Sequence, residues 1–247
     1  MNDWDTCFAL ATLIVLGGGN PYWVAWYYNP PWMTFALAPI AWLPPVAAML
    51  LPLVVLAYAS YKVRKPYLIA LVGLSYPFVA QSLYANVDWL VLLGVVVKGP
   101  LGAILVTTKP QTGGLAFIAE LREKTWRQRF LFLLPLALVI GIATLMFPEW
   151  IDRILHPTIL IAGNRNFSLF PYSLILFPFA LYWCWKRSDP LWGVVASLCV
   201  APYYYVHSYL ALMFLLADRN WKLGLAFSAV LWGLFALVYT GVIQLNL

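Results

Sequence analysis

The sequence contains few charged residues for its length. Charged side chains make up 10% of the 247 residues, whereas a soluble domain carries about 25%. Hydrophobic residues make up 64%, so most of the surface must face apolar surroundings. At roughly 20 residues for each helix that crosses a bilayer, the chain has room for about eight to ten membrane segments. The composition therefore predicts a membrane protein and leaves no room for a separate soluble domain.

Cysteine and histidine are also scarce. Cys7, Cys184 and Cys199 lack the spacing of metal ligands, so we expect packing roles and neither a structural metal site nor an inferable disulfide. His156 and His207 are far apart in the sequence and suggest no metal motif. We therefore expect no cofactor, and the sequence offers no support for a divalent cation.

The charges that are present are mostly basic, with a net charge of +6. Loop charge that orients a membrane protein is the ordinary cause of such an excess. Nucleic-acid binding requires a basic stripe on a wettable surface, and the chain has none. We therefore expect no nucleic-acid partner. The N-terminus is acidic, whereas a secretory signal peptide begins with basic residues, so we also expect no signal peptide.

Apolar runs separated by polar breaks fill the chain, and none alternates residue by residue as a membrane strand does. We therefore predict an all-α transmembrane bundle, because helices satisfy their own backbone hydrogen bonds in lipid. The bundle forms one domain over residues 1–247, in which 1–32 is an outer-face interfacial helix and loop. The long runs are 33–60, 67–84, 130–147, 168–185, 191–206 and 223–245. The short runs are 89–97, 99–108, 112–121 and 209–217.

Several runs do not have the length of one upright span. Residues 7–16 reach only about 15 Å as a helix, against a hydrocarbon core of about 30 Å, so we expect them to lie on or dip into the membrane. The run 33–60 is too long for one upright helix and short for two. Charge bias favours one net crossing there, with a re-entrant piece as an open alternative.

The three consecutive short runs, 89–97, 99–108 and 112–121, are about half a bilayer long. Lipid does not tolerate helix ends at mid-depth, so these segments must pack against other helices or line a wet cavity. Broken helices around a mid-membrane cavity are a common way to build a polar substrate site. Helix tilt and local thinning of the bilayer are the alternative.

Basic residues predict the orientation of the chain. If Asp5 lies outside and each run changes side once, twelve of the 15 lysines and arginines fall inside. The three outside are Lys109, Arg153 and Arg165. The twelve inside are Lys62, Arg64, Lys65, Lys98, Arg122, Lys124, Arg127, Arg129, Lys186, Arg187, Arg219 and Lys222.

Ionisable groups at membrane depth or at its outer edge are candidates for function. Asp3 and Asp5 precede the first run, Asp88 lies between two runs, and Lys109 lies at the tip of two short helices. An acid can act as a general base toward a sugar hydroxyl, and a lysine can stabilise a phosphate leaving group. The alternatives are a wet tail for Asp3, a helix cap for Asp88 and a snorkelling Lys109.

Aromatic residues are concentrated in the first outer loop. They are Tyr22, Trp23, Trp26, Tyr27, Tyr28 and Trp32. An interfacial aromatic belt explains such a cluster. Aromatic faces also stack on sugar rings, so Tyr22, Tyr28 and Trp32 are candidate substrate contacts.

The order of these motifs resembles the GT-C-fold membrane glycosyltransferases, in particular the bacterial mannosyltransferase-like group of glycosyltransferase family 87. The resemblance covers roughly residues 3–216 and follows the acids at Asp3 and Asp5. The later motifs, in order, are Gly18-Gly19-Asn20-Pro21-Tyr22, Tyr28-Asn29-Pro30-Pro31-Trp32, Ala38-Pro39, Ala85-Asn86-Val87-Asp88, Lys109-Pro110-Gln111, Asn166-Phe167-Ser168-Leu169-Phe170-Pro171-Tyr172 and Ala201-Pro202-Tyr203.

The resemblance implies an activity and its residues. Such enzymes transfer a sugar from a polyprenyl phosphate to an acceptor hydroxyl at the outer face, with inversion. Asp5 matches the catalytic base best and Asp3 second. Lys109 matches the position that a lipid phosphate approaches, and Asp88 and Asn86 border the same cavity. The expected location is the bacterial cell membrane as a multi-pass protein, with membrane lipids and a polyprenyl-phosphate-linked sugar as partners.

The chain departs from the family pattern at its start. The family places a full transmembrane helix before the acid, whereas here Asp5 stands near a terminus, where chains tend to fray. The alternative hypothesis is a truncated, inactive relative that serves as a structural or assembly subunit beside other membrane proteins. A transporter or lipid-binding protein is a third alternative.

Overall fold

The computed structural model describes residues 2–155 and 166–240. The structure is 74% helical, and the described residues contain no strand. The all-α prediction is therefore confirmed for them. His156 and Arg165 lie outside the described residues.

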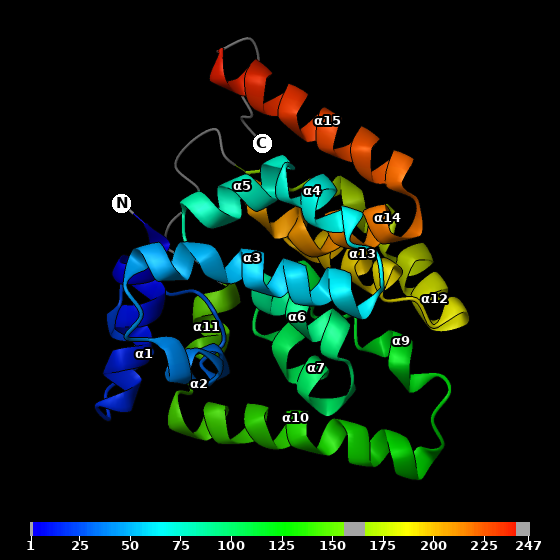
Figure 1. Cartoon of the computed structure of the whole chain (residues 1–247). Coiled ribbons are helices and arrows are strands. Elements are labelled where there is room, and N and C mark those ends of the chain that lie inside the picture. Colours follow the sequence, from blue (N-terminus) through cyan, green and yellow to red (C-terminus); the bar gives the residue numbers. More distant parts are fainter. Residues whose placement is uncertain (1, 156–165, 241–247) are drawn as a thin grey trace.

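The helices follow one another with short connections (Figure 1). In chain order they are η1 (Trp4–Phe8), α1 (Ala9–Leu16), η2 (Pro21–Trp23), α2 (Trp32–Leu37), η3 (Ala38–Ile40), α3 (Pro45–Lys62), α4 (Tyr67–Gly73), α5 (Tyr76–Leu83), α6 (Trp89–Val97), α7 (Gly99–Thr107), α8 (Pro110–Gly113), α9 (Ile118–Leu121), α10 (Trp126–Met146), α11 (Trp150–Leu155), η4 (Tyr172–Ile175), α12 (Phe177–Arg187), α13 (Pro190–Val200), η5 (Val206–Tyr209), α14 (Leu210–Arg219) and α15 (Trp221–Tyr239).

Three described helices, α3, α10 and α15, are long and apolar enough to cross a membrane. Each has a clear start signal. α3 begins with Pro45, α10 follows a capping box between Thr125 and Gln128, and the Asn220 side chain caps α15. The remaining described helices are shorter than a full span, so the predicted eight to ten segments and the multi-pass arrangement stay predictions.

The structure divides several of the long apolar runs. The run 33–60 contains one helix long enough to cross, α3, preceded by α2 and η3. The run 67–84 breaks at Leu74 and Ser75 into α4 and α5. The short run 112–121 is not one helix, because turns at residues 114–117 separate α8 from α9. Hydropathy located these segments but did not detect the breaks inside them.

A hairpin of two half-length helices, α6 and α7, forms the centre of the molecule. Lys98 and Gly99 make the turn between them with positive φ angles of 60° and 68°. The two helices approach closely at Gly94 and Gly102, where an added Cβ on Gly94 would lie 2.8 Å from the Gly102 carbonyl oxygen. α6 packs against α3 and α7 packs against α10 (Figure 1). Of the arrangements expected for the short apolar segments, α6 and α7 thus show packing against other helices.

The orientation in the membrane is open to a direct test. In a variant without native cysteines, we expect an impermeant thiol reagent on intact cells to label Asp5→Cys and to miss Lys62→Cys. Both positions are solvent-exposed in the structure, so access depends on the membrane side alone. Labelling of Lys62→Cys should appear only after the cells are permeabilised. Labelling of both positions from the same side would contradict the predicted topology.

Candidate functional site

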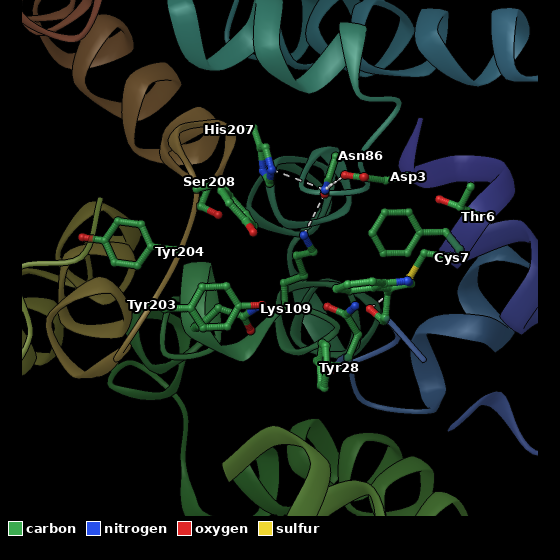
Figure 2. A pocket seen from close by; sticks show the side chains of 15 residues that line it. Asp3, Thr6, Cys7, Tyr28, Asn86, Lys109, Tyr203, Tyr204, His207 and Ser208 are labelled. Carbon is green, nitrogen blue, oxygen red and sulfur yellow. Dashed lines mark hydrogen bonds between the residues drawn. The ribbon is translucent and has the colours of Figure 1, made fainter. Parts of the chain in front are cut away.

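A cavity of about 370 Å³ opens where four segments far apart in the sequence meet (Figure 2). These segments are the N-terminal helix η1 with its flanking residues, the loop after α5, the link from α7 to α8, and the loop that leads into η5; a fifth segment, the loop between η2 and α2, completes the lining. Its lining residues are Asp3, Thr6, Cys7, Phe8, Trp26, Tyr28, Asn29, Asn86, Lys109, Gln111, Tyr203, Tyr204, Tyr205, His207 and Ser208.

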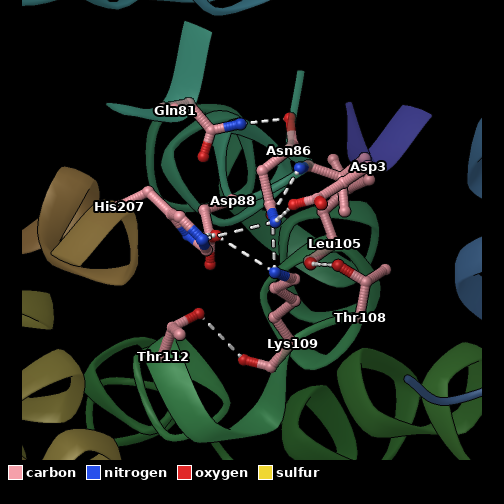
Figure 3. A network of polar contacts seen from close by, with 10 residues as sticks. Asp3, Gln81, Asn86, Asp88, Leu105, Thr108, Lys109, Thr112 and His207 are labelled. Atoms are coloured by element: carbon pink, nitrogen blue, oxygen red, sulfur yellow. Dashed lines mark hydrogen bonds and ion pairs between the residues drawn. The ribbon is translucent and has the colours of Figure 1, made fainter. Parts of the chain in front are cut away.

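Asn86 is the centre of a polar network in this cavity (Figure 3). Its Nδ2 donates to Asp3 Oδ2 at 2.7 Å and faces His207 Nε2 at 3.4 Å. Its Oδ1 accepts from Lys109 Nζ at 2.7 Å and from the Val87 backbone N–H at 2.7 Å. One amide side chain therefore connects the acid, the lysine and the histidine.

Asp88 lies directly behind Lys109 and His207 and is 1% exposed. Its Oδ2 accepts from Lys109 Nζ at 3.0 Å and contacts His207 Nδ1 at 2.6 Å. A carboxylate can only accept, so Nδ1 of His207 carries the hydrogen. The Asn86 amide nitrogen faces the other ring nitrogen, Nε2. The contacts to Asp3 and Lys109 fix the orientation of the Asn86 amide.

The N-terminal segment is held in place by three contacts. The Asp3 backbone N–H donates to the Tyr84 carbonyl at 2.8 Å, beside the carboxylate contact to Asn86. The Trp4 indole donates to the Leu43 carbonyl at 2.9 Å, and its side chain is 1% exposed. These contacts offset the tendency of a chain end to fray and hold Asp3 at the cavity.

The loop that carries Tyr203, Tyr204 and Tyr205 is held by a second distant segment. The Phe167 N–H donates to the Tyr204 carbonyl at 2.9 Å, and the Ser168 hydroxyl donates to the Ala201 carbonyl at 2.5 Å. The motif at residues 166–172 therefore lies against the motif at 201–203. Tyr203, Tyr204 and Tyr205 line the cavity, and residues 166–172 support them from behind.

The predicted site residues fall into two groups. Asp3, Asn86, Lys109 and Tyr28 line the cavity, and Asp88 contacts Lys109 behind it. The other three are Asp5, which is exposed, and the buried Tyr22 and Trp32, none of which is among the lining residues. The structure thus brings one N-terminal acid, Asp3, to the lysine network and leaves Asp5 on the outside of η1.

Tyr22 and Trp32 instead pack in the first loop. The Tyr22 hydroxyl donates to the Asn29 carbonyl at 2.9 Å. The Trp32 ring meets the Trp150 ring edge-on, with centroids 5.1 Å apart. These contacts shape the loop that presents Tyr28 and Trp26 to the cavity.

Sequence reasoning missed His207 and the tyrosines at 203–205 as site residues. His207 lies 119 residues from Asp88, and no motif spacing joins them. The one feature of the sequence that pointed to His207 was the scarcity of histidine in an apolar chain. Tertiary structure alone brings the pair together.

The described residues contain no group of three or more acidic, histidine or cysteine side chains that could hold a metal ion. The cavity and the residues behind it carry side chains of both charges. Asp3 and Asp88 supply two negative charges, and Lys109 supplies one positive charge, 5% exposed. The arrangement can accept a proton at Asp3 and donate a hydrogen bond from Lys109.

In comparisons with known proteins, no family model, no curated protein and no solved structure matches this chain.

Proposed function

We propose that the chain is a GT-C-like membrane glycosyltransferase that moves a sugar from a polyprenyl-phosphate donor to an acceptor hydroxyl. The single observation that carries the proposal is the cavity in which Asp3, Asn86 and Lys109 meet beneath aromatic side chains. Such a site offers a base and a cation within one space of about 370 Å³. The cavity volume falls in the range of roughly 300–1,000 Å³ that small-molecule sites have.

Lys109 is the proposed contact for the donor phosphate. An ammonium group has three N–H donors, and two of them go to Asn86 Oδ1 and Asp88 Oδ2. The third is left for a phosphate oxygen. Because the group is nearly buried, its attraction for phosphate is stronger than in bulk water.

Asp3 is the proposed general base. Asn86 donates to one of its carboxylate oxygens, Oδ2, so the carboxylate is held at the cavity wall. Asp5, the first choice from the sequence, is exposed and lies outside the cavity. A base must lie within hydrogen-bond reach of its proton, and Asp3 meets this requirement better than Asp5.

The proposed reaction is one displacement. The acceptor oxygen attacks the anomeric carbon from the face opposite the phosphate, and the bond between that carbon and the phosphate oxygen breaks. The acceptor proton passes to Asp3. The polyprenyl phosphate leaves with the electron pair beside Lys109, and the anomeric configuration inverts. Aromatic rings at Trp26 and Tyr203 offer faces for the sugar or the acceptor.

The test is sugar transfer by purified protein from a polyprenyl-phosphate sugar. We expect Lys109→Gln to reduce kcat by about a hundredfold, as when one electrostatic stabiliser of a transition state is lost. Lys222→Gln, an exposed lysine at the start of α15, should leave kcat unchanged. Size-exclusion and thermal-unfolding profiles of both variants report whether the fold is intact.

The alternative function is a structural or assembly subunit without activity. One observation favours it: the Lys109–Asp88–His207 cluster is already internally paired and suits a purely structural role. Wild-type protein that binds no donor, transfers no sugar and copurifies with other membrane proteins in a fixed ratio would establish this alternative and end the enzyme proposal.

A further inference from the structure

A second cavity of about 500 Å³ lies at the opposite end of α6 from the first. The C-terminal ends of α3, α6 and α14 and the start of α13 form it. Its lining residues are Lys62, Val63, Val95, Val96, Val97, Lys98, Asp189, Pro190, Leu191, Phe214, Leu215, Asp218 and Arg219. The four segments lie far apart in the sequence, and the predicted topology assigns their basic residues to one membrane side.

The charges of this second cavity do not cancel. Asp189 pairs with Arg219, and Asp218 pairs with Lys65 at 2.8 Å. Both acids are therefore already neutralised. The side chains of Lys62 and Lys98 have no ion-pair or hydrogen-bond partner within residues 2–155 and 166–240. Two positive charges remain for a ligand.

The depth of the second cavity follows from the length of α6. Asp88 precedes α6 at the first cavity, and Lys98 follows it at the second. Nine residues of helix span at most roughly 14 Å, about half the hydrocarbon thickness of a bilayer. With the two cavities on opposite membrane sides, as the predicted topology has them, they cannot both lie outside the hydrocarbon region unless the bilayer thins. An ammonium group at such a depth needs a counter-charge.

Glu120 lies near Lys98 but outside the second cavity, where it accepts from the Gly99 backbone N–H at 2.9 Å. Within the second cavity itself, the counter-charge is left to a ligand from the adjoining membrane side. The side chains between the two cavities are apolar and buried, among them Leu92 and Met213. The first cavity and its carboxylates are thus separated from Lys62 and Lys98 by packed hydrocarbon. The opposite wall of the second cavity, with Val96 and Phe214, is apolar as well.

We propose that the second cavity binds the phosphate headgroup of an anionic phospholipid from the leaflet that adjoins the end of α3. Lys62 and Lys98 contact the phosphate oxygens. The apolar wall holds the glycerol backbone and the first methylene groups of the acyl chains. The match of two unpaired cations with an apolar wall fits a lipid better than a free anion, which would leave that wall in contact with water. The proposal does not depend on sugar transfer.

The experiment measures lipid retention after reconstitution in phosphatidylcholine vesicles that contain a minority of phosphatidylglycerol. Native mass spectrometry of the re-extracted wild type should show one retained phosphatidylglycerol. In the double variant Lys62→Gln/Lys98→Gln, the dissociation constant for phosphatidylglycerol should rise on the order of thirtyfold, since each basic residue contributes about a fivefold factor in affinity near an anionic surface. The matched control is Lys186→Gln/Lys222→Gln, which removes the same charge from exposed positions outside the cavity and should retain the lipid.

Lys62→Gln alone keeps the proposal testable if the double variant fails to fold. Lys62 is exposed at the end of α3, so this variant should fold and should weaken retention about fivefold. Equal retention of both lipids by the wild type would overturn the proposal. Equal losses in the cavity and control variants would overturn it as well, as would displacement of the lipid by inorganic phosphate.

Discussion

Replacing Asp88 with asparagine should lower the free energy of unfolding by about 3–5 kcal/mol, the cost of breaking a buried ion pair by removing one partner. The reason is the position of Lys109, whose side chain is 6% exposed beside an Asp88 side chain that is 2% exposed. Without the carboxylate, the positive charge of Lys109 stays buried beside neutral amide oxygens, those of Asn86 and of the new asparagine. His207 Nδ1 likewise faces a neutral acceptor in place of a carboxylate.

The matched control for Asp88 is Asp218→Asn. Asp218 pairs with Lys65 at 2.8 Å, but these side chains are 30% and 38% exposed. Water screens such a pair, so its loss should cost less than about 1 kcal/mol. Steric trapping of the unfolded state in detergent measures the free energy of unfolding of both variants. Equal effects of the two substitutions would show that the Asp88 cluster is not the buried ion pair that the geometry describes.

Replacing Asp3 with asparagine should reduce the rate of sugar transfer by about 10²- to 10⁴-fold, the range that general base catalysis contributes. The side chain keeps its size, and an asparagine carbonyl can still accept the hydrogen bond from Asn86. Donor binding should therefore change little, because a base acts in the chemical step. The measurement is kcat and KM for the polyprenyl-phosphate sugar.

Asp5→Asn is the control for Asp3, because it makes the same chemical change two residues away on the exposed side of η1. We expect Asp5→Asn to transfer sugar at the wild-type rate. A large loss in Asp5→Asn together with normal activity in Asp3→Asn would restore the assignment made from the sequence. The pair thus decides which N-terminal acid is the base.

Lys109 illustrates how a site residue can be found from the sequence. It is a lone cation between two short apolar segments, and a charge in that place either serves a function or destabilises the folded protein. The segment lengths predicted that 89–97 and 99–108 pack against other helices. Asp88 and Asn86 were accessible by the same reasoning, because they precede the first of these segments. Composition and hydropathy also predicted the all-α class of the described residues.

The choice between Asp3 and Asp5 illustrates what the sequence left open. Both acids precede the same apolar run, and sequence distance favours neither. The turn of η1 decides it, since Asp3 faces Asn86 while Asp5 points outward. The sequence also did not distinguish among the first-loop aromatics: Tyr28 lines the cavity, whereas Trp32 packs against Trp150.

Composition and hydropathy by themselves predicted the helical class, the apolar segments in which α3, α10 and α15 lie, and the polar residues at the ends of the short segments. These properties depend on local composition, which each stretch of chain carries with it. Only the tertiary structure decided that His207 meets Asp88 and that Lys62 and Lys98 share a cavity. The first pairing depends on how α6 and α14 pack side by side, and the second on how α3 packs against α6. Contacts between such distant segments leave no periodic trace in a single sequence.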